Sequence, residues 1–163
     1  MSKFSRLIIN IGKQTLYCLD NQQNIVKEYP VSTSSFGCGN QNGSFKTPLG
    51  EHSIAQKIGA GCPANEVFVG RQPQGVLETI IAQGQTLPED IITSRILRLQ
   101  GLEPGLNQGP GIDSYERYIY IHGTAEEDKI GQPASHGCIR MRNADVIELF
   151  DNVSEDCRVL IQE

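Results

Sequence analysis

Two short stretches in the last third of the sequence carry residue types that enzymes use for covalent catalysis. SHGCIRM, residues 135–141, contains His136, Cys138 and Arg140, and a second histidine, His122, follows the stretch YIYI. A cysteine attacks carbonyl carbon as its thiolate, and it needs a base within hydrogen-bond reach. Positive neighbours and a helix start about five residues later would both favour the thiolate. Cys138 is therefore a candidate nucleophile with two candidate bases.

The same residues allow three other interpretations. Cys138 can be a small apolar residue packed in a turn, and composition alone does not separate this from catalysis. His122, His136 and Cys138 can be zinc ligands with a fourth position for water. Against zinc, the chain has no CxxC pair, and the two histidines lie 14 residues apart. A redox sensor needs a resolving cysteine, and no spacing marks one.

The elements that must position these side chains are mostly strands. RLIINIGKQTLYCLD and IVKEYPVST flank the turn NQQN and predict an opening hairpin, while residues 34–50 are rich in Gly, Ser and Asn and predict a loop. GEHSIAQKIG, residues 96–102 and CRVLIQE predict further strands, and EVFVG and GVLETII are strand-like between glycine and proline breaks. YERYIYIHG is the clearest strand, with Tyr118, Tyr120 and His122 on one face.

One helix is predicted directly after Cys138. Asn143 is a suitable N-cap, and Asp145 lies in the first turn, where it suits the helix dipole. Apolar residues then recur at helical spacing, namely Val146, Leu149, Phe150 and Val153. The expected fold is mainly β with one main helix after the cysteine, in a single domain over residues 1–163.

Composition and charge exclude several classes of protein. A net charge of -5 does not favour nucleic acid as a partner, and no apolar run approaches the ~20 residues of a membrane span. The N-terminus has an apolar patch of only Leu7, Ile8 and Ile9, whereas a signal peptide needs about 7–15 apolar residues. The five cysteines show no disulfide framework, as in a reducing compartment. We therefore expect a cytoplasmic protein without a membrane or nucleic-acid partner.

The motif pair YIYIHGT and SHGCIRM resembles the signature of the L,D-transpeptidase catalytic domain, the YkuD-type family. That signature is a histidine, a spacer in the mid-teens, and [S/T]HGC followed by an apolar residue and often arginine. FKTPLGEHSI resembles the T-P-x-G turn of the family, and the opening hairpin resembles its first strands. The resemblance covers most of the chain except residues 59–116. It implies a mixed β-sandwich with the cysteine at the mouth of a groove.

The resemblance also implies catalytic roles. Cys138 would be the nucleophile, and His122 would be its base and later the acid. Ser135 and His136 would support the site. The backbone amides near Gly137 and Cys138 would form the oxyanion hole.

The implied substrate is the tetrapeptide stem of peptidoglycan, cut between the L-centre of its third residue and D-Ala at position four. Arg140 would bind a substrate carboxylate, a task that suits its planar fork. Gly123 and Thr124 would contact the substrate as well. Carbapenems, which mimic the acyl donor, are the expected covalent inhibitors. No metal or organic cofactor is implied.

The acceptor of the acyl group decides between several activities. An amine of another stem gives a 3–3 cross-link, a free D-amino acid gives exchange, and water gives hydrolysis. Because no export signal is seen, we expect a soluble muropeptide as substrate and an L,D-carboxypeptidase of cytoplasmic wall recycling. A cross-linking transpeptidase is the second expectation, and a non-catalytic muropeptide-binding module is the third.

Two features outside the motifs carry further expectations. The irregular stretch 59–116 is long for a small domain, so we expect a lid and substrate specificity there. His52, beyond the TPLG turn, is expected to be a structural or surface histidine.

Overall fold

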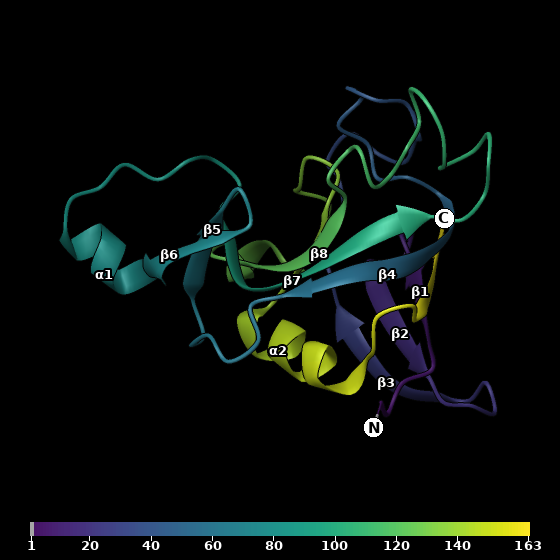
Figure 1. The fold of residues 1–163 in the computed structure, drawn as a ribbon, viewed down its shortest axis with the longest axis horizontal. Coiled ribbons are helices and arrows are strands. Elements are labelled where there is room, and N and C mark those ends of the chain that lie inside the picture. The colour runs from purple at the N-terminus through teal and green to yellow at the C-terminus, as the bar shows by residue number, and fades with distance from the viewer. Residues whose placement is uncertain (1) are drawn as a thin grey trace.

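The computed structural model describes residues 2–163 and contains one large mixed sheet (Figure 1). The strands are β1 (Arg6–Asn10), β2 (Thr15–Leu19), β3 (Ile25–Pro30), β4 (Gly50–Ile58), β5 (Glu66–Val69), β6 (Gln72–Val76), β7 (Ile92–Gly101), β8 (Tyr120–Thr124), β9 (Ile139–Met141) and β10 (Arg158–Gln162). The helices are α1 (Leu77–Ala82), α2 (Asn143–Asn152) and the 3-10 helix η1 (Glu127–Lys129). The prediction of a mainly β fold with one main helix after Cys138 is confirmed.

The strand order brings the two ends of the sequence together. The order is β3-β2-β1-β10-β4-β7-β5-β6, with β8 added to β7 and β9 added to β8. β10 lies between β1, to which it is parallel, and β4, to which it is antiparallel. Leu7, Ile9, Val159 and Ile161 are buried on the same face of this part of the sheet. The predicted opening hairpin and the predicted closing strand are therefore both present. The closing strand is β10, and it pairs directly with β1 of the hairpin.

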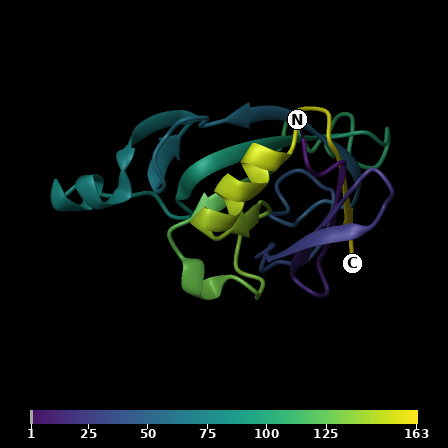
Figure 2. The ribbon, with the colours of Figure 1, turned by 90° about the horizontal axis from the view of Figure 1, so that it is seen from below.

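Helix α2 covers the sheet where the two sequence motifs lie (Figure 2). It packs on β7 and β8 and buries Val146, Leu149 and Phe150 in the main core. The prediction that Asn143 caps this helix is wrong, because Arg142 holds the N-cap position and Asn143 is the first helical residue. The Asn143 N–H instead donates to Glu127 Oε2 at 2.7 Å, so a carboxylate from η1 caps the helix.

The Asn143 side chain joins three elements that surround the site. Its Oδ1 accepts hydrogen bonds from Thr93 Oγ1 and Ser94 Oγ, each at 2.6 Å. Its Nδ2 donates to Thr124 O at 3.0 Å and to Glu127 Oε2 at 3.1 Å. The buried amide thus links β7, β8 and η1 to the start of α2. Both of its polar atoms have hydrogen-bond partners.

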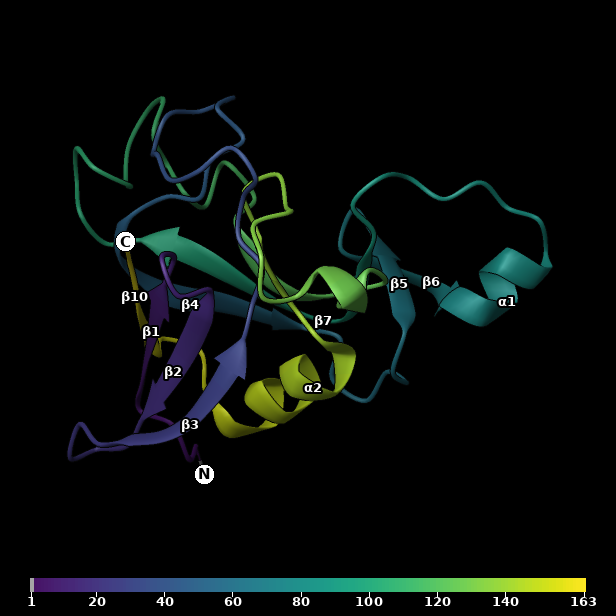
Figure 3. The ribbon, with the colours of Figure 1, turned by 180° about the vertical axis from the view of Figure 1, so that it is seen from behind.

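β5, β6 and α1 stand away from the rest of the sheet on one side (Figure 3). EVFVG forms β5 as predicted. The prediction of a strand over GVLETII is wrong in part, because helix α1 begins at Leu77. A short run rich in Ile and Val has the same composition in a strand and in a one-sided helix. Only Ile80 of this helix is buried. No helix within residues 2–163 combines the length and the apolar character that crossing a membrane requires.

His52 was expected to be either a structural or a surface histidine, and it is a structural one. The ring is fully buried in β4, with Nδ1 2.9 Å from Gly50 O and Nε2 2.8 Å from Ser114 Oγ. Burial lowers the pKa of His52 from 6.5 to about 4, because a charged imidazole would lose its hydration there.

This burial predicts a pH-dependent stability. Below pH 6.5 the unfolded chain takes up a proton that the folded chain accepts only near pH 4, so stability is lost as pH falls through this window. His52 alone should lower the free energy of unfolding by about 2 kcal/mol between pH 8 and pH 5. Urea unfolding at both values checks this, with His52→Gln as the comparison. An equal loss in both proteins would contradict the assignment.

Candidate functional site

The pairing of β8 with β9 sets the orientation of the site residues. The strands are parallel, with Ile121 beside Ile139 and His122 beside Arg140. Ile121 and Ile139 are buried in the main core, so His122 and Arg140 point to the opposite face. Cys138 lies two residues before Arg140 and therefore points to that face as well. There it packs against a second, smaller apolar cluster from β5, β7 and β8.

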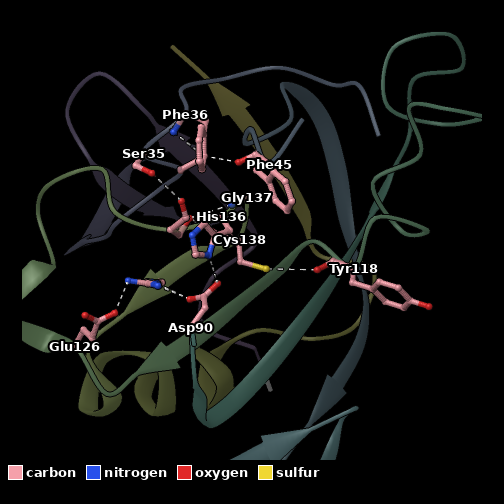
Figure 4. A network of polar contacts seen from close by, with 12 residues as sticks. Ser35, Phe36, Phe45, Asp90, Tyr118, Glu126, His136, Gly137 and Cys138 are labelled. Atoms are coloured by element: carbon pink, nitrogen blue, oxygen red, sulfur yellow. Dashed lines mark hydrogen bonds and ion pairs between the residues drawn. The ribbon is translucent and has the colours of Figure 1, made fainter. Parts of the chain in front are cut away.

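Two backbone groups hold the Cys138 thiol, and Figure 4 shows one of them, the carbonyl of Tyr118. Its Sγ accepts a hydrogen bond from the Tyr120 N–H at 3.3 Å and donates to Tyr118 O at 3.4 Å. Tyr118 has a φ of 56°, in the left-handed region, and it precedes β8. The predicted strand over YERYIYIHG is therefore too long, and Tyr118 does not continue the face of Tyr120 and His122.

The electrostatics of the thiol differ from the expectation. The pKa of Cys138 is raised to about 12, chiefly by burial and to a lesser extent by the charge of Asp90. The Tyr120 N–H and the charges of Arg140 and Arg117 lower the pKa, but their effect is smaller. The charge of Arg140 favours the thiolate, as predicted, but desolvation outweighs it, so the expected net shift toward the thiolate is wrong. Cys138 is a neutral thiol at neutral pH.

His122 is a buried, neutral imidazole. Its Nδ1 lies 2.6 Å from Gly123 O, and since a carbonyl only accepts, Nδ1 carries the proton. Burial lowers the pKa of His122. Nε2 is buried and has no hydrogen-bond partner within residues 2–163. An unprotonated nitrogen with a free lone pair thus lies on the same face as the Cys138 thiol, although no hydrogen bond joins them in the described structure.

Gly123 and Thr124 are both buried in β8. A Cβ on Gly123 would lie 2.5 Å from Thr93 O, so only glycine fits beside β7. Thr124 Oγ1 accepts the Glu126 N–H at 3.0 Å, and Thr124 also lines a cavity next to β9. The predicted contacts of both residues with a substrate stay predictions.

The turn that carries Cys138 is fixed by its own serine and by the TPLG motif. Ser135 Oγ donates to Cys138 O at 2.6 Å and accepts the Gly137 N–H at 3.3 Å. Gly137 has a φ of 129°, which favours glycine, and its carbonyl accepts a hydrogen bond from Thr47 Oγ1 at 3.0 Å. The two motifs therefore meet in space. The predicted oxyanion contact of Gly137 stays a prediction, because its N–H is engaged by Ser135.

His136 is exposed and lies between two cavities. Its ring centroid is 6.2 Å from the rings of both Phe36 and Phe45, which are also exposed. One cavity, of about 410 Å³, is lined by residues from the loop before β7 and from β8 to β9, including Asp90, Glu126 and Arg140. The other, of about 250 Å³, is lined by Asn42, Gly43, Phe45, Arg117, Ile119 and His136.

Arg140 is buried and already paired with carboxylates. Its Nε donates to Asp90 Oδ1 at 2.8 Å, its Nη2 contacts the same oxygen, and its Nη1 donates to Glu126 Oε1 at 3.3 Å. Asp90 Oδ2 also lies 3.5 Å from His136 Nδ1 (Figure 4). The predicted contact of Arg140 with a substrate carboxylate stays a prediction, and it requires one of these carboxylates to give way.

Sequence reasoning did not assign four residues to this site, namely Thr47, Asp90, Glu126 and Asn143, the last of which was expected only as a helix cap. Thr47 lies in a motif that was recognised, but the motif does not reveal its bond to Gly137. The zinc interpretation finds no support in the donor arrangement, because no three His, Cys, Asp or Glu side chains in residues 2–163 converge in a metal-binding geometry.

The chain was compared with known families and proteins. The model of the L,D-transpeptidase catalytic domain, YkuD, matches residues 5–161. The probable L,D-transpeptidase YcfS of Escherichia coli K12 is 26% identical over 158 residues, which cover 95% of this chain and 43% of that protein. The putative L,D-transpeptidase YkuD of Bacillus subtilis 168 is 54% identical over 46 residues, or 28% of each chain. The matched part spans less than half the length of either relative.

Solved structures agree in fold. L,D-transpeptidase 3 from Mycobacterium tuberculosis, in complex with a faropenem-derived adduct, has a TM-score of 0.57 at 15% identity, over 96% of this chain and 59% of that chain. An L,D-transpeptidase from Mycobacterium smegmatis has a TM-score of 0.57 at 14% identity, over 99% and 59%. Together with the family match over residues 5–161, these findings show that the chain belongs to the YkuD family of L,D-transpeptidase catalytic domains.

Proposed function

We propose that this protein cleaves the tetrapeptide stem of peptidoglycan by acyl transfer, with Cys138 as nucleophile and His122 as base. One observation carries the proposal: a thiol and a buried imidazole with a free Nε2 share one face of β8 and β9. A base must be unprotonated to act, and burial keeps His122 in that form. Membership of the L,D-transpeptidase family supports this reaction class.

The first step starts from two neutral groups. The thiol turns from Tyr118 O, its proton passes to His122 Nε2, and the sulfur electron pair attacks the carbonyl carbon of the third stem residue. The C=O electrons move to the oxygen, and the Tyr120 N–H stabilises charge on the sulfur. The tetrahedral intermediate then expels the D-Ala amine, which takes the proton from His122. The product is a thioester on Cys138.

The surrounding turn would stabilise the developing oxyanion. Amides near Gly137 and Cys138 are the proposed donors, and one such donor is typically worth about 3–4 kcal/mol. For Gly137 this requires its N–H to leave Ser135 Oγ. Ser135 would hold the turn through its hydrogen bond to Cys138 O. His136 would line the cavity on each side of its ring.

Water is the proposed acceptor, which makes the enzyme an L,D-carboxypeptidase of soluble muropeptides in cytoplasmic wall recycling. Five free cysteines, with Cys18 and Cys157 buried, suit a reducing compartment. Formation of 3–3 cross-links is the second candidate. The presence of cavities on both sides of His136 favours it, because a cross-linking enzyme must hold a donor and an amine acceptor.

Removal of the thiol is the first test. Cys138→Ala should lower turnover of a disaccharide-tetrapeptide by about 10⁴-fold or more, since no other group forms the thioester. The free energy of unfolding should change by less than about 1 kcal/mol, because the residue is small and partly exposed. Mass spectrometry should show a carbapenem adduct on the native protein alone. Tripeptide formation by the variant at the native rate would exclude thiol catalysis.

The two histidines should differ. His122→Gln should lower kcat/KM by about 10²-fold or more, whereas His136→Gln should lower it by less than about tenfold. Because burial lowers the pKa of His122, the acid limb of the kcat/KM profile should lie below the ordinary histidine value of about 6.5. Equal or reversed losses would show that the roles are assigned wrongly. Near-ultraviolet circular dichroism of both variants controls for folding.

The products separate the two candidate activities. With excess tetrapeptide, hydrolysis should release D-Ala and tripeptide in equal amounts, because water competes for every thioester. Liquid chromatography with mass detection resolves tripeptide from cross-linked dimer. Dimer as the main product would replace the carboxypeptidase proposal with the cross-linking one, and Cys138→Ala provides the blank.

A further inference from the structure

The loop over residues 83–91 joins α1 to β7, and its residues 88–91 line the 410 Å³ cavity together with Arg140 of β9. Residues 86–89 make no hydrogen bond within the described chain, so this part of the loop is not held by its own backbone. Asp90 is the point of attachment (Figure 4). It has a φ of 58°, a left-handed conformation that aspartate adopts more readily than most residues.

The Asp90 carboxylate bridges two residues of the motif SHGCIRM. One oxygen accepts two guanidinium N–H groups of Arg140, and the other lies 3.5 Å from His136 Nδ1. The guanidinium is nearly fully buried, whereas the Asp90 side chain is 20% exposed at the edge of the 410 Å³ cavity. A charge-assisted contact of this kind fixes orientation as well as distance.

Several other charges face this carboxylate. Glu126 pairs with the outer side of the same guanidinium, and Lys129 pairs with Glu126 at 2.6 Å. Glu89 lines the same cavity, and the charge of Arg117 lowers the pKa of the Cys138 thiol. The Glu126 side chain is 42% exposed, so solvent screens its charge more than that of Asp90.

We propose that Asp90 is a positioning residue of the active site, which aligns Arg140 and His136 and holds the 83–91 loop beside the 410 Å³ cavity. This inference rests on the proposed function for its catalytic meaning. The carboxylate is also close enough to act on the reacting pair, since it raises the pKa of both Cys138 and His122. A negative charge here opposes the thiolate and favours the imidazolium, so it moves both titrations to higher pH together.

Asp90→Asn tests the charge, because it keeps the shape and most hydrogen bonds. Without the carboxylate, the thiol should ionise at lower pH, and Cys138 should react with iodoacetamide about three- to tenfold faster at pH 8. The acid limb of kcat/KM should move to lower pH, and kcat/KM at its optimum should fall by about tenfold as Arg140 and His136 lose alignment.

Glu126→Gln is the matched control, since it removes the second carboxylate on Arg140. It should leave the alkylation rate of Cys138 within about twofold of the native protein, because its charge is screened. Equal acceleration in both variants, or none in Asp90→Asn, would overturn the inference.

A longer side chain provides an independent variant. Asp90→Glu keeps the charge and displaces the loop, so alkylation should stay close to native while kcat/KM falls. The comparison of Asp90→Glu with the native protein remains decisive if Asp90→Asn does not fold. A native value of kcat/KM in Asp90→Glu would overturn the positioning role. Alkylation is measured without substrate. Failure of the proposed function would therefore appear as absent turnover in the native protein, with the alkylation results still testing Asp90.

Discussion

Three residue pairs hold β9 parallel to β8, and the site depends on their register. Ile139 and Met141 must enter the core under α2, which turns Cys138 and Arg140 to the other face. A shift of one residue would move the arginine into the apolar main core and turn the isoleucine to the face of His122. A three-residue strand cannot hold such a register by itself. Thr47 on Gly137 and Asn143 at the start of α2 anchor the two ends of β9.

Desolvation, more than the neighbouring charges, determines the protonation of Cys138 and His122. The guanidinium nearest the thiol is neutralised by two carboxylates, so little positive potential remains to offset burial. Cys138 and His122 therefore rest without charge, because burial disfavours the charged form of each. A neutral thiol of this kind is protected from oxidants that react with thiolates. The pairing of β8 with β9 thus places a neutral thiol and a neutral imidazole on one face of the sheet.

Local pattern was sufficient for the central part of the site. Strand alternation in YIYIHG placed Tyr120 and His122 on one face, and the helix after Cys138 followed from its apolar spacing. The raised pKa of the thiol was not predictable, because it arises from burial, which the neighbouring letters do not report. Asp90 was also not predictable, since it reaches Arg140 across 50 positions from a loop without periodicity. The same limit applies to GVLETII, where α1 extends away from the sheet.

The place of β10 in the sheet has a consequence for synthesis. Of the described strands, β1, β2 and β3 are synthesised before the others, but they join β4 only through β10, which follows all of them in the sequence. Until residue 162 has emerged from the ribosome, the edge of β1 that pairs with β10 stays open. The sheet therefore closes after translation of all its strands, with contacts far apart in sequence, which is a slow kind of folding. A nascent chain that stalls before β10 would have two separate, incomplete sheets. The turn that carries Cys138 would reach its final register only after the two sheets join.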